Sequence, residues 1–182
     1  MNALTFTDEH QESPCRAQPE MDTSARIKAA REVLLQGLEL LFGLGAGAYS
    51  EATSESGASI GDHYGQAIQH FRSLIGGYRS REIRYAAGSP DGRLGSDLVY
   101  ASIATCDVLR ALKHYPPESF ARECRVAGGQ RVNRDDLSDF TSTLSDELAY
   151  CTATAVQQYE AIRGICEQPG IAACSRLPAR EE

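Results

Sequence analysis

The sequence contains no tryptophan, no apolar run long enough to cross a bilayer, and no cysteine pair at metal-binding spacing. Its first residues, MNALTFTDEHQESPCR, do not combine a basic region with an apolar run, so no secretory signal is expected. The cysteines show neither C-x-x-C nor zinc-ribbon spacing, which favours reduced thiols in a cytoplasmic protein. They are Cys15, Cys106, Cys124, Cys151, Cys166 and Cys174.

An excess of positive charge is also lacking. Lysine and arginine number 18 against 25 aspartates and glutamates, which gives a net charge of −7. Nucleic-acid binding needs a clustered basic face to neutralise phosphates, and here the basic residues are scattered. The densest group suits the solvated C-terminal end of a helix; it comprises Arg72, Arg79, Arg81 and Arg84. Nucleic acid is therefore not expected as the main partner.

A chain of 182 residues suits one domain with tails better than two domains. Residues 1–21 are polar, contain two prolines and show no period, so we expect a disordered tail. A second, short tail is expected over 169–182. The domain itself is predicted over 22–168, where apolar residues recur at helical spacing.

Four segments carry apolar residues three and four positions apart, as amphipathic helices do. They begin near Asp22, Ser59, Ser96, and Ser142 or Thr143. A loop rich in glycine, serine and threonine is expected between Gly43 and Ser59. Before the fourth segment, Gly128-Gly129 lies between two short alternating runs, which predicts a hairpin over 124–132. The sequence thus predicts an all-α four-helix bundle with a small β-hairpin between helices 3 and 4.

Four short strings resemble segments of the DinB/YfiT-like metalloenzyme superfamily. They are Ser-Ile-Gly-Asp-His at 59–63, Gln-His-Phe at 69–71, Thr-Leu-Ser-Asp-Glu-Leu at 143–148 and Gln-Gln-Tyr-Glu-Ala-Ile at 157–162. In the family, the second helix opens with Ser-Ile-Gly and ends with His-Phe, and the last core helix carries His-x-x-x-His. The resemblance covers about residues 24–168 and implies a DinB-like four-helix bundle.

The resemblance also implies a metal site built from three histidines on these two helices, in proteins that transfer or isomerise small thiol adducts. The three positions fall on Gln66, Thr154 and Gln158. Neutral amides and a hydroxyl are poor ligands for zinc or nickel. The resemblance therefore implies a degenerate site without a metal, enclosed in the bundle either as a vestige or as a small-molecule pocket. We expect a non-catalytic binding or structural module rather than an enzyme.

Two alternatives remain open. The chain could keep metal-dependent thiol S-transferase or isomerase chemistry with other ligands for zinc or nickel, the candidates being His63, His70 and Glu147. It could also be a stress-related protein-interaction module that presents one helix face. Because family members often pair through their helices, the resemblance also implies a homodimer.

Overall fold

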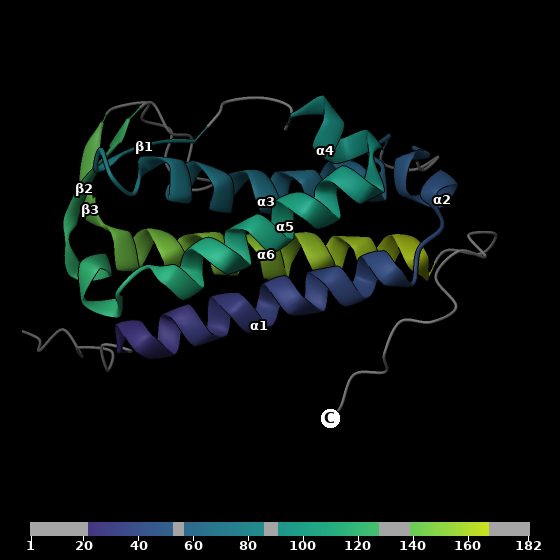
Figure 1. Cartoon of the computed structure of the whole chain (residues 1–182). Coiled ribbons are helices and arrows are strands. Elements are labelled where there is room, and N and C mark those ends of the chain that lie inside the picture. Colours follow the sequence, from purple (N-terminus) through teal and green to yellow (C-terminus); the bar gives the residue numbers. More distant parts are fainter. Residues whose placement is uncertain (1–21, 53–56, 86–90, 128–138, 168–182) are drawn as a thin grey trace, which may run out of the picture.

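The computed structural model describes residues 22–52, 57–85, 91–127 and 139–167. These residues form a mostly helical protein with a small three-stranded sheet at one end (Figure 1). Both predicted tails and the predicted turn at Gly128-Gly129 lie outside the described residues. No described helix has the length and apolarity that a membrane span requires.

Four long helices enclose one hydrophobic core. They are α1 (Thr23–Phe42), α3 (Ile60–Gly77), α5 (Leu98–His114) and α6 (Leu144–Cys166). α3 packs against α5 and α6, and α1 packs against the same two helices (Figure 1). Large side chains with no more than 1% exposure fill the space between them, among them Leu34, Leu41, Tyr64, Phe71 and Leu148. The four helical segments predicted from the sequence are confirmed.

Local capping sets two of the helix starts. Ser59 accepts a hydrogen bond from the Asp62 backbone N–H at 3.0 Å, and the Asp62 carboxylate accepts one from the Ser59 N–H at 2.9 Å. This reciprocal capping box begins α3 at the predicted residue. Thr143 caps α6 by accepting from the Asp146 N–H at 3.1 Å.

Two short helices were not predicted. α2 (Ala46–Ser50) lies in the segment expected to be a loop. Its Tyr49 is fully buried and anchors the helix to the core. α4 (Gly92–Ser96) ends at the residue predicted to begin the third long helix. The cap of α5 is instead Asp97, whose carboxylate accepts from the Tyr100 N–H at 2.9 Å.

The sheet has the order β1-β2-β3 and comprises β1 (Glu82–Arg84), β2 (Glu123–Ala127) and β3 (Phe140–Thr143). β2 and β3 are antiparallel, as a hairpin between α5 and α6 requires. The described antiparallel partner of β2 is thus β3, whereas the strand predicted over 130–132 lies outside the described residues. The parallel pairing of β1 with β2 was not foreseen. A 3₁₀ helix, Pro117–Ala121, leads into β2.

Among the cysteines of the described residues, Cys166 departs from the sequence-based expectation. Cys166 is disulfide-bonded, so the prediction of uniformly reduced thiols is wrong for this residue. Cys106, Cys124 and Cys151 form no disulfide. Disulfides are unusual in a reducing compartment, so this one gives no support to the predicted cytoplasmic localisation. That localisation stays a prediction.

Candidate functional site

The candidate metal position lies along the seam between α3 and α6. Near the start of α3, His63 Nδ1 is 2.7 Å from Gln158 Oε1, late in α6. Two turns further along α3, the His70 ring centroid is 5.7 Å from that of Tyr150, early in α6. Residue numbers therefore rise on one helix as they fall on the other, and the two helices are antiparallel along this seam.

The positions implied by the resemblance fall within this stretch. Gln66 lies on α3 between the two histidines, and Thr154 lies on α6 one turn before Gln158. Thr154 is buried at 5% exposure and Gln158 is half-buried, but Gln66 is exposed. The expectation that all three lie inside the bundle is wrong for Gln66. The buried stripe of α3 is formed by apolar residues three and four positions apart, and Gln66 lies outside this stripe on the solvent side.

The hydrogen bond between His63 and Gln158 defines the chemistry at this position. A glutamine Oε1 only accepts, so His63 Nδ1 carries the proton and donates it to the amide oxygen. The side chains at the three triad positions offer two amides and one hydroxyl, a neutral set that does not fit zinc or nickel. Within the described ranges, no three His, Cys, Asp or Glu side chains converge closely enough to hold a metal ion.

A second polar cluster lies at the other end of the seam, where Tyr85 reaches in from the end of β1. The Tyr85 hydroxyl donates to Glu147 Oε2 at 2.8 Å and lies 3.7 Å from Cys151 Sγ. Glu147 is fully buried. The Tyr85 ring centroid is 5.3 Å from that of His70 and 5.5 Å from that of Tyr150. At these distances the rings pack against one another.

Burial makes Tyr85 a hydrogen-bond donor. Loss of solvation raises the pKa of the Tyr85 phenol far above its ordinary value, and the nearby Cys151 and Glu147 raise it further. The hydroxyl therefore keeps its proton and directs it at the Glu147 carboxyl. This interaction fixes the end of β1 to α6.

The alternative site of His63, His70 and Glu147 is divided between the two clusters. His63 is two turns from His70 on α3 and donates to Gln158. The Tyr85 ring lies against His70 while its hydroxyl contacts Glu147. The structure does not gather the three side chains into one ligand set.

Replacing Tyr85 with phenylalanine should destabilise the protein by about 1.5 kcal/mol, because the buried Glu147 carboxyl loses a donor. Tyr115→Phe is a matched control. The Tyr115 ring stacks on Tyr78, and its hydroxyl bonds to no other described residue. This change should alter stability by less than about 0.5 kcal/mol. Urea unfolding of both variants measures the difference, and equal midpoints would contradict the role assigned to the Tyr85 hydroxyl.

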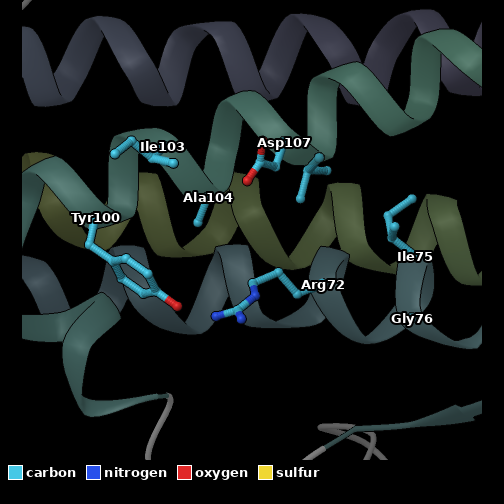
Figure 2. Close-up of a pocket in the computed structure, with 8 residues that line it drawn as sticks. Arg72, Ile75, Gly76, Tyr100, Ile103, Ala104 and Asp107 are labelled. Atoms are coloured by element: carbon cyan, nitrogen blue, oxygen red, sulfur yellow. The ribbon is translucent and has the colours of Figure 1, made fainter.

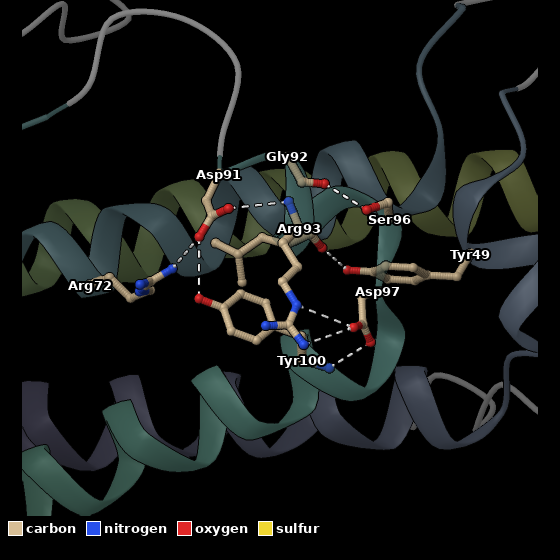
Figure 3. Close-up of polar contacts among 9 residues, drawn as sticks. Tyr49, Arg72, Asp91, Gly92, Arg93, Ser96, Asp97 and Tyr100 are labelled. Carbon is tan, nitrogen blue, oxygen red and sulfur yellow. Dashed lines mark hydrogen bonds and ion pairs between the residues drawn. The ribbon is translucent and has the colours of Figure 1, made fainter.

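Sequence reasoning missed a groove between α3 and α5 and the polar network beside it (Figures 2 and 3). The network depends on α4, which was not predicted as a helix, so the only sequence signals were its individual charges. Arg72 had been assigned to a solvated helix end rather than to a network.

No protein-family model, curated protein or solved structure matches the chain. The described residues define the class: a mostly helical protein with a small three-stranded sheet.

Proposed function

We propose that the chain is a DinB-like four-helix bundle with a degenerate metal position, which acts as a binding or structural module rather than as a metalloenzyme. The observation that carries this proposal is the 2.7 Å hydrogen bond between His63 and Gln158. In this bond His63 Nδ1 donates to the Gln158 amide, and by the resemblance the family has a metal-binding histidine at the position of Gln158.

The positions of the resembling strings support the bundle. The string at 59–63 begins at the cap of α3, and the string at 143–148 begins at the cap of α6. These two helices pack against each other, as the pair that carries the family's metal site must. α1 and α5 complete a set of four long helices around one core.

The donor chemistry favours binding over catalysis. A metal bound at this position would supply Lewis acidity and stabilise a thiolate. Amide and hydroxyl groups can do neither, but they can donate to and accept from a small polar ligand. The enzyme alternative needs His63, His70 and Glu147 to act as one set, and their division between two clusters counts against it.

Metal analysis of protein purified without a histidine tag tests this proposal. We expect zinc and nickel contents well below one equivalent per chain, even from cells grown with both metals added. A stoichiometric content of either metal that survives dialysis would overturn the proposal and favour the enzyme alternative.

We further propose that the module is a homodimer that pairs through the outer face of α1. Leu35 and Phe42 lie seven residues apart on this face and are 48% and 85% exposed. A twofold axis at Leu35 would set two α1 helices antiparallel, with Arg31 of each copy opposite Glu39 of the other. Both residues are exposed, so the pairing adds opposite charges beside an apolar centre.

Sedimentation equilibrium should show a dimer for the natural chain. The variant Leu35→Glu should be monomeric, because it places two carboxylates at the apolar centre of the pairing. Val156→Glu changes a 40% exposed apolar residue on α6 and should leave the dimer intact. A natural chain that remains monomeric at high concentration would contradict the pairing.

A further inference from the structure

A groove runs between α3 and α5 on the side of the molecule that carries α4 (Figure 2). Its volume is about 320 Å³, which is at the lower end of the range for small-molecule sites. Apolar side chains line much of it, among them Ile75 of α3 and Ile103 and Val108 of α5. Ile103 is 54% exposed, so the groove offers apolar surface that no described residue covers.

The groove is open because small residues line both helices. Gly76 provides no side chain on α3, and a methyl group built there would meet no atom within 4 Å. On α5 the corresponding wall is formed by Ala104. The space is therefore available to a ligand without movement of either helix.

Opposite charges border the groove. Arg72 extends from α3 and Asp107 from α5 (Figure 2). Although both belong to the described part of the chain, they do not pair with each other. Arg72 Nη1 instead contacts Asp91 Oδ2 at 3.2 Å, and Asp107 Oδ1 accepts from Arg110 Nη1 at 2.8 Å. Arg72 and Asp107 thus present opposite charges to the groove without pairing with each other.

The network at α4 holds Arg72 in place (Figure 3). Asp91 accepts from the Tyr100 hydroxyl at 3.3 Å and from the Arg93 backbone N–H at 3.1 Å. The Arg93 N–H and the Arg72 guanidinium lower the pKa of the Asp91 carboxyl, which stays ionised. The Tyr100 ring lies 5.9 Å from the Arg72 guanidinium carbon and 4.4 Å from that of Arg93.

This arrangement leaves Arg72 ready for a ligand. Only its Nη1 hydrogen-bonds to another described residue, so Nε and Nη2 remain as a two-pronged donor for a carboxylate. Because the guanidinium is already positioned, binding loses little side-chain entropy.

We propose that the groove binds a small zwitterion with a large apolar side chain, of the class of free aromatic or branched α-amino acids. Its carboxylate pairs with Arg72, its ammonium with Asp107, and its side chain packs on Ile75 and Val108. A simple acid would make no contact with Asp107 through a cation, and a simple amine would make none with Arg72 through an anion. The inference names a ligand for the proposed binding module, but it uses the α3–α5 face rather than the α3–α6 seam.

Titration of the full chain with L-phenylalanine, followed by amide chemical shifts, tests the ligand class. We expect saturable binding to one site, with shifts centred on residues that line the groove. 3-Phenylpropanoate and 2-phenylethylamine each lack one charge and should bind at least tenfold more weakly. Equal binding of either analogue would overturn the charge assignment, and no saturable binding of L-phenylalanine would overturn the proposal.

Filling the groove tests its location. Gly76→Leu should abolish the binding of L-phenylalanine while leaving the fold intact, since its side chain enters open space. Gly164→Leu is the matched control, because this exposed glycine of α6 also has no atom within 4 Å of a built methyl group. It should bind as the natural chain does. Unchanged affinity in Gly76→Leu would overturn the assignment of the groove.

Charge-neutral variants complete the test. Arg72→Gln and Asp107→Asn should each weaken L-phenylalanine binding about tenfold and leave the binding of the analogue that lacks the matching charge unchanged. An equal loss for all three ligands would overturn the pairing. Metal content is measured independently, so a failure here is distinguishable from a failure of the degenerate-site proposal.

Discussion

Replacing Gln66, Thr154 and Gln158 together with histidine should raise zinc affinity by about a thousandfold or more, equivalent to about 4 kcal/mol. Thr154 and Gln158 are one turn apart on α6, so two imidazoles there would share one face. Gln66 lies on the antiparallel stretch of α3 and would supply the third. Three imidazoles leave an open coordination position, and the exposure of Gln66 gives it access to solvent.

Competition with a zinc indicator measures this gain, and two controls sharpen it. The double variant Thr154→His with Gln158→His should bind zinc more weakly than the triple variant, because it lacks the ligand from α3. His63→Ala in the triple background tests whether the existing imidazole contributes. A folded triple variant that takes up no zinc would show that the three positions are aligned incorrectly.

Replacing Gly61 with alanine should destabilise the protein by about 3 kcal/mol, the upper part of the range for overpacking. The added methyl group would lie 1.9 Å from the Gly95 carbonyl oxygen and 2.9 Å from Tyr49 Cε1. A backbone carbonyl cannot rotate away as a side chain can, so α4 must separate from α3.

The control for this change lies on the same helix. Gly76→Ala meets no atom within 4 Å and should stabilise the protein by about 0.5 kcal/mol, because alanine favours the helix. Guanidinium unfolding of both variants should therefore give shifts of opposite sign. A Gly61→Ala variant as stable as the natural chain would contradict the close docking of α4 on α3.

Elements with local signals were predicted well. Ser59, and either Ser142 or Thr143, were expected to cap helices, and Ser59 and Thr143 do, since a cap and its partner lie three residues apart in the sequence. α2, α4 and β1 were missed because each is short and depends on distant contacts. Tyr49, for example, holds α2 by packing its ring 6.3 Å from that of Tyr64.

Helical spacing sets His63 and Gln158 beside the apolar stripes of α3 and α6, but the contact between them depends on how the two helices pack. Helical spacing could not reveal that Tyr85, which follows β1, would come between His70 and Glu147. Nor could it reveal the exposure of Gln66, which depends on how α3 is rotated toward its neighbours. The spacing of the cysteines in the sequence likewise could not predict the disulfide at Cys166.

The central claim is that the natural chain has lost the ligands for a transition metal. Zinc titration of the tag-free natural protein, after chelation and in competition with an indicator of micromolar affinity, tests it most directly. We predict that the natural chain will not remove zinc from the indicator, even at protein concentrations at which the triple-histidine variant is saturated with zinc. Uptake of one zinc per natural chain, lost on His63→Ala or His70→Ala, would contradict the account.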